Sequence, residues 1–157
     1  MKSKRENIAE YILYLWQLED YLRAFPEQAN DSAELDEILR MMHEEGVMQS
    51  GHIQLAKNAL SEMEELHDEL LASEAPYRAV IQHIEPALNL LKAKTDRPGM
   101  SDVEACLILL YQVMMLRLQK KPISEATEVT LKDATQLLRF LSRTYYDESN
   151  NGEYTGD

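Results

Sequence analysis

Apolar positions recur at intervals of three and four along most of the chain, which is the spacing of helices that bury one face. No segment alternates apolar and polar residues in the manner of a half-buried strand. The sequence therefore predicts an all-α fold, a bundle of about six helices. We expect them near residues 6–24, 32–46, 50–72, 76–94, 102–120 and 124–146.

Local signals mark several of the helix ends. The first helix should end before Pro26, because the residue that precedes a proline avoids the helical conformation. Gly46 is a natural residue for the end of the second helix. Pro86 lies inside the fourth helix and predicts a kink there or a division into two helices. Serines stand at three expected N-cap positions, Ser32, Ser101 and Ser124.

The helix at residues 102–120 is apolar around nearly its whole circumference, so we expect it at the centre of the bundle with the other helices around it. A chain of 157 residues is long enough for one domain with a substantial core. We predict a single helical domain over residues 1–146. Residues 147–157 are acidic and rich in Asn and Gly, which predicts a disordered tail.

The chain carries 28 acidic and 16 basic residues, a net charge of −12, which argues against binding to nucleic acids or anionic membranes. Cys106 is the single cysteine and lies in an apolar run, so we expect no disulfide and a buried, unreactive thiol. The most apolar stretch, residues 105–116, is too short to span a bilayer. We therefore expect a soluble cytoplasmic protein.

One carboxylate lies on the buried side of the first helix. At 100° per residue, Glu19 falls within the apolar stripe of that helix, whereas Asp20 points toward water. A buried carboxylate without a partner is costly, so Glu19 should pair with Arg23 one turn on or with Arg117 of the central helix. Such a pair would be either a structural brace or the floor of a binding pocket.

Two histidines, His52 and His67, project toward the apolar side of the third predicted helix. They are 15 residues apart, about 22 Å along a helix, too far to bind one metal ion. Glu64 and His67 have the Glu-x-x-His spacing of di-iron bundles, but such bundles use that motif twice and this chain has it once. Acidic pairs spaced by three residues are about as frequent as random placement gives. We predict neither a metal site nor a cofactor.

Three segments together resemble a known family: RENIAEYILYLWQLEDYLR, GHIQLAKNALSEMEELHDELL and PISEATEVTLKDATQLLRFLSRTYY. The chain is similar over nearly its whole length to an uncharacterised family of small bacterial domains of unknown function, predicted to be all-helical. This resemblance implies a cytoplasmic bacterial protein. It implies no activity, cofactor or catalytic residue.

The usual motifs of nucleophilic, nucleotide-binding and redox enzymes do not occur. The first hypothesis is therefore a structural or protein-interaction domain, either a homodimer or the partner of another protein. The alternative is an enzyme or a protein that binds a small molecule in a pocket. Its candidate pocket residues are Tyr11, Trp16, Glu19, Arg23, His52, His67 and Arg117.

Overall fold

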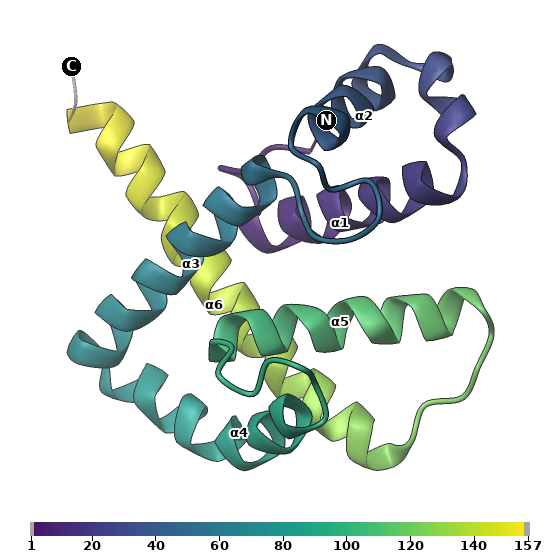
Figure 1. The fold of residues 1–157 in the computed structure, drawn as a ribbon. Coiled ribbons are helices and arrows are strands. Elements are labelled where there is room, and N and C mark those ends of the chain that lie inside the picture. Colours follow the sequence, from purple (N-terminus) through teal and green to yellow (C-terminus); the bar gives the residue numbers. More distant parts are fainter. Residues whose placement is uncertain (1, 156–157) are drawn as a thin grey trace. The chain divides into compact units, whose positions relative to one another are not determined.

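A computed structural model describes the backbone of residues 2–155 and the side chains of residues 2–150. Every regular element in this described part is a helix, which confirms the predicted all-α fold (Figure 1). The elements are α1 (Ile8–Ala24), the 3₁₀ helix η1 (Pro26–Asp31), α2 (Ala33–Glu44), α3 (Gln54–Ser73), α4 (Ala75–Ala93), α5 (Asp102–Leu118) and α6 (Glu125–Thr155).

The helices divide into two compact units, Met1–Glu62 and Met63–Asp157. Helix α3 contributes its first residues to unit 1 and the rest to unit 2. The single domain expected over residues 1–146, and the expectation that all other helices surround α5, concern both units together and stay predictions.

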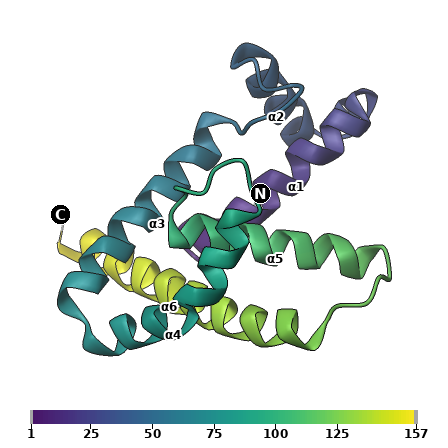
Figure 2. The same ribbon diagram turned by 60° about the horizontal axis from the view of Figure 1, so that its bottom comes forward.

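Unit 1 consists of α1, η1, α2 and the start of α3, with α1 packed on both η1 and α2 (Figure 2). The buried face of α1 includes Ile12, Leu15 and Leu22, as its apolar stripe predicts. Tyr14 of α1 donates a hydrogen bond to the Glu34 carboxylate of α2, and this bond raises the pKa of Tyr14 to about 12. Side chains therefore join the first two helices at a partly buried polar contact.

Unit 2 contains α4, α5 and α6, each packed on the other two, and the remainder of α3. A turn at residues 119–124 joins α5 to α6 (Figure 1). In α5, residues 103–107 are all buried, whereas Leu118 at its end is exposed. Consecutive residues of α5 are buried only in its first half, and in its second half Val113 is the buried residue.

Most predicted helix boundaries are confirmed. α1 ends at Ala24, before Pro26. At each of the three predicted N-caps, the serine hydroxyl accepts a hydrogen bond from the backbone N–H three residues later, as a cap requires. These bonds join Ser32 to Leu35 at 3.1 Å, Ser101 to Glu104 at 3.1 Å and Ser124 to Thr127 at 3.2 Å.

Two predictions within helices are corrected. α3 begins at Gln54 and not near residue 50, because Gly51 has a φ of +92°, outside the helical region. Of the two outcomes predicted at Pro86, the division is wrong, because α4 continues through the proline, and the kink stays a prediction. Pro86 lies on the exposed side of the helix, so the carbonyl four residues earlier, which lacks its helical donor, can bind water. The buried residues Ile84 and Leu88 anchor the helix on both sides of the proline.

The segment after residue 146 includes the end of α6, which continues to Thr155. The disordered tail expected over residues 147–157 stays a prediction. Each residue added to an existing helix gains one backbone hydrogen bond, so a polar segment can prolong a helix that the core already holds. Residues 156–157 of the predicted tail lie outside the described residues.

Candidate functional site

Glu19 is fully buried, as its place on the α1 stripe predicts, and both of its oxygens are occupied within unit 1. Oε1 lies 2.7 Å from Nδ1 of His52, and Oε2 accepts a hydrogen bond of 2.7 Å from the backbone N–H of Ile53. Ile53 directly precedes α3, where unpaired N–H groups and the helix dipole favour a negative charge. Glu19 thus caps α3 from another helix.

The prediction that Glu19 pairs with Arg23 of the same helix is wrong. The Arg23 guanidinium pairs with Asp20 at 3.0 Å and donates hydrogen bonds to the carbonyls of Val47 and Gly51. The reason is that Glu19 points inward, where a bare backbone N–H is available, while Arg23 lies at the edge and reaches the loop. Glu19 and Arg23 together hold both ends of the loop between α2 and α3.

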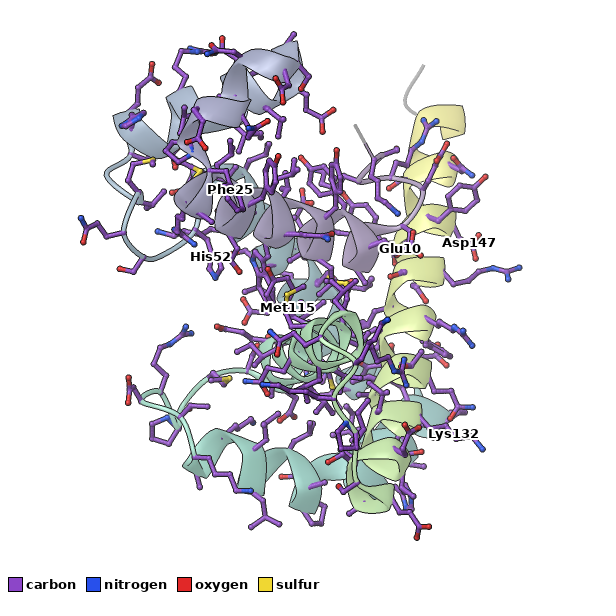
Figure 3. All side chains as sticks on the ribbon, turned by 90° about the vertical axis from the view of Figure 1, so that its right-hand side faces the viewer. Glu10, Phe25, His52, Met115, Lys132 and Asp147 are labelled. Carbon is purple, nitrogen blue, oxygen red and sulfur yellow. The ribbon has the colours of Figure 1, made fainter. Side chains whose placement is uncertain are left out.

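His52 projects from this loop and is labelled in Figure 3. Its ring stacks on Trp16, with ring centroids 4.9 Å apart and planes inclined by 20°. The side chain is 41% exposed, while Trp16 is buried. Because a carboxylate accepts hydrogen bonds, the bond to Glu19 assigns the proton to Nδ1 of His52 and holds the ring in one orientation.

Tyr11 is the fifth candidate residue in unit 1, and it is buried. Burial, with a smaller effect of the Glu62 carboxylate, raises the pKa of its phenol.

His67 belongs to unit 2 and lies in a different polar network. Its Nδ1 is 2.5 Å from the hydroxyl of Tyr77, and its Nε2 is 3.9 Å from a carboxylate oxygen of Asp102. Asp102 also pairs with Lys92. Burial lowers the pKa of His67 and raises that of Tyr77. Sequence reasoning missed Tyr77, Lys92 and Asp102.

A weak signal for one of these contacts exists in the chain. α3 ends at Ser73 and α4 begins at Ala75, so a sharp corner separates His67 from Tyr77. Two residues that stand close before and after such a corner can meet. Lys92 and Asp102 flank the longer connection between α4 and α5, which has no comparable signal.

Two further predictions concern single residues of unit 2. The Cys106 thiol is buried, and burial raises its pKa to about 12, as expected of an unreactive core cysteine. Arg117, the long-range partner predicted for Glu19, pairs with Glu128 of α6 at 3.6 Å, and both side chains are more than half exposed. Among the described residues, no group of three or more His, Cys, Asp or Glu side chains could hold a metal ion.

The candidate pocket residues are divided between the two units. In unit 1, His52 contacts both Glu19 and Trp16, and Arg23 binds carbonyls of the same loop. In unit 2, His67 contacts Tyr77, and Arg117 pairs with Glu128. The contacts in unit 1 join α1 to the loop before α3.

A different surface is conspicuous on α6. Seven exposed residues of this helix follow one another at alternating intervals of four and three, and we call them the α6 stripe. They are Glu125, Val129, Lys132, Gln136, Arg139, Arg143 and Tyr146. Figure 3 labels Lys132 among them. This spacing keeps all seven on one side of the helix, as in the seam of two packed helices.

The α6 stripe combines apolar and charged groups. Val129 is 62% exposed, and Phe140 beside the stripe is 44% exposed. A groove of about 550 Å³ runs along this part of α6. Its lining residues, four of which belong to the stripe, are Glu128, Val129, Leu131, Lys132, Thr135, Gln136 and Arg139.

Comparison with known proteins places the chain in a family. A family model described as a domain of unknown function (DUF4924) matches residues 1–34 and 26–153. The chain belongs to the DUF4924 family. The resemblance to an uncharacterised family of helical domains is thereby confirmed. No curated protein and no solved structure matches this DUF4924 member. Among its described helices, none is both long and apolar enough to cross a membrane.

Proposed function

We propose that the protein is a protein-interaction domain and that the α6 stripe is its binding surface. The observation that carries this proposal is the continuous exposed seam on α6, seven residues at helical packing intervals with the exposed side chains of Val129 and Phe140 in it or beside it. Helices that bind other helices present their contact residues at this spacing.

The local charge supports the same surface. Residues 105–146 contain six basic and three acidic side chains, although the whole chain carries a charge of −12. The stripe itself contains Lys132, Arg139 and Arg143. A partner surface that offers carboxylates to these cations would be attracted to it, although the chain as a whole is acidic.

The contacts give less support to the alternative, a small-molecule pocket around Glu19, His52 or His67 and Arg117. Glu19 has no exposed surface, and both of its oxygens are hydrogen-bonded. Arg117 is exposed and paired with Glu128. These contacts support a structural role for Glu19 as a brace between α1 and the loop before α3.

The proposal includes a location in the bacterial cytoplasm. A single cysteine that lies buried in the core is compatible with a reducing compartment.

Hydroxyl-radical footprinting of the full chain tests the proposed surface. The chain is labelled in dilute purified form and again at native abundance in cell extract, and side-chain oxidation is read by mass spectrometry. We expect protection of Val129, Phe140 and Tyr146 in the extract. Leu90 of α4, which is 68% exposed, serves as the matched control and should be labelled equally in both samples.

Equal labelling of the α6 stripe in both samples overturns the proposed function. Protection confined to Tyr21 and Phe25, the exposed aromatic residues near the end of α1, also overturns it, because the interaction would then involve unit 1. A V129E variant should lose the protection of Phe140 and Tyr146, while an L90E variant should retain it.

A further inference from the structure

We propose that the partner of the α6 stripe is the same stripe of a second copy, packed antiparallel, so that the protein forms a symmetric homodimer through α6. This inference rests on the proposed function and names the partner for that surface. It follows from the order of charges and apolar groups along the helix.

The charges of α6 are ordered along its exposed side. Glu125 and Glu128 lie in its first turn, and Arg139 and Arg143 lie about three to five turns later. When two such helices pack antiparallel about a two-fold axis near Ala134, Glu125 comes opposite Arg143 of the second copy. Glu128 then lies one residue from the level of Arg139 of the second copy, a shift of about 1.5 Å that the long arginine side chain spans. Two-fold symmetry makes each of these pairs twice.

A parallel arrangement has the opposite consequence. When two α6 helices lie side by side in the same direction, each glutamate lies opposite the same glutamate of the second copy. Each arginine likewise lies opposite the same arginine. Like charges directly opposite each other cost free energy, whereas the antiparallel arrangement converts all four positions into attractive pairs. The charge order therefore selects one direction.

The exposed apolar groups meet in the same register. About the axis near Ala134, Val129 lies one residue from the level of Phe140 of the second copy, and Lys132 comes opposite Gln136 of the second copy. Val129 and Phe140 are two of the apolar side chains that α6 leaves exposed. The paired segment, residues 125–143, is about 27 Å long at 1.5 Å per residue. Five turns of helix are thus engaged from each copy.

Contacts within one chain do not prevent this pairing. Glu128 forms an ion pair with Arg117 at 3.6 Å, but both side chains are more than half exposed. Exposed pairs of this kind contribute little to stability, so the Glu128 carboxylate can exchange Arg117 for an arginine of the second copy.

Sedimentation equilibrium of the full chain and of charge-reversed variants tests the antiparallel dimer. Two double variants, E125R/E128R and R139E/R143E, each bring like charges together, and we expect each to dimerise at least tenfold more weakly than the natural chain. An equimolar mixture of the two should form a heterodimer, because every facing pair is again of opposite sign. The quadruple variant E125R/E128R/R139E/R143E restores the pairing within one chain and should dimerise again.

Circular dichroism of each variant verifies that it is folded, and all four positions are exposed. A dimer whose affinity is unchanged in both double variants overturns the antiparallel register. If the natural chain stays monomeric at the highest concentrations, the proposal that a second copy binds the α6 stripe is overturned. If footprinting nevertheless shows the α6 stripe protected in extract, the proposed function stands and a different protein is the partner. If the stripe is unprotected as well, both proposals fail.

Discussion

Glu19 accepts two hydrogen bonds at a position that water does not reach, and its replacement is expected to be costly. In a Glu19→Gln variant, the amide oxygen can keep only one of the two donors, and its NH₂ group is turned toward the other. We expect the free energy of unfolding to fall by about 2 kcal/mol, the usual cost of a buried charged hydrogen bond. Urea denaturation followed by circular dichroism measures this change.

Glu10 provides the matched control for this substitution, since it is an exposed carboxylate of the same helix whose salt bridge to Lys2 spans 3.5 Å. Glu10→Gln should change the free energy of unfolding by less than about 0.5 kcal/mol. Equal effects of the two substitutions would contradict the structural role assigned to Glu19.

His67 is expected to make stability depend on pH. Burial lowers the pKa of its imidazole in the folded chain, so the unfolded chain takes up the proton first as the pH falls. Stability contributed by neutral His67 is complete above the unfolded pKa of about 6.5 and is lost below it, by at most about 1.4 kcal/mol per pH unit. Denaturation curves at pH 7.5 and at lower values follow this loss.

A His67→Gln variant should have a flatter dependence of stability on pH between 7.5 and 5. The same substitution at His43, which is exposed on α2, should leave the dependence of the natural chain in place. An unchanged slope in the His67 variant would show that other groups govern the loss of stability in acid.

For single residues, the sequence predicts the direction in which a side chain points better than it predicts the group to which that side chain binds. The helical period correctly turns Glu19 inward and Asp20 outward. The partner of Glu19 is a backbone N–H and a histidine more than 30 residues away, and a backbone donor has no signature in a sequence. Rules for neighbours within one helix therefore selected Arg23, which instead binds the loop carbonyls.

Among the elements, α4 is notable because it continues through a proline. Pro86 removes one backbone hydrogen bond from an exposed turn of this helix. A Pro86→Ala variant should raise the free energy of unfolding by about 1–3 kcal/mol, because alanine restores the N–H and relieves the clash with the preceding turn. Thermal denaturation measures the gain.

Pro76 lies in the first turn of the same helix, where its missing N–H would have no helical partner in any case. Pro76→Ala should therefore change stability little. A loss of stability in Pro86→Ala would indicate that the proline ring itself contributes a packing contact.

Helix starts that depend on local caps were predictable, and those that depend on distant groups were not. Ser32, Ser101 and Ser124 each cap their own helix, so a short window of sequence contains the whole signal. α3 begins later than expected because its first N–H groups are bound by carboxylates outside it: Glu19 binds that of Ile53 and Glu45 binds that of Gln54.

For the whole molecule, the proposed homodimer predicts a melting temperature that rises with protein concentration, because association stabilises only the folded chain. Four ion pairs between exposed groups should also make the dimer sensitive to salt. We expect dimer affinity to fall as sodium chloride is raised from about 0.05 M to about 1 M, where screening acts within about 3 Å. Sedimentation at both salt concentrations measures it.

An affinity that salt does not change would assign the association to Val129 and Phe140 alone, without the charge order. The composition of the whole chain would not have revealed the surface, since a net charge of −12 conceals a basic region in residues 105–146. The fold class, by contrast, was predictable because the helices carry their own apolar periods, and α1, α2, α5 and α6 also carry their own caps.

The loop between α2 and α3 is held by side chains of α1 rather than by its own neighbours in sequence. Its length is therefore fixed by the one-turn separation of Glu19 and Arg23. A residue inserted between Val47 and Ile53 would break the hydrogen bonds of Arg23 or those of Glu19 to this loop, and loss of the latter would leave α3 without its cap. The turn at residues 120–123, with mostly exposed side chains, has no such constraint and should accept inserted residues or a peptide tag.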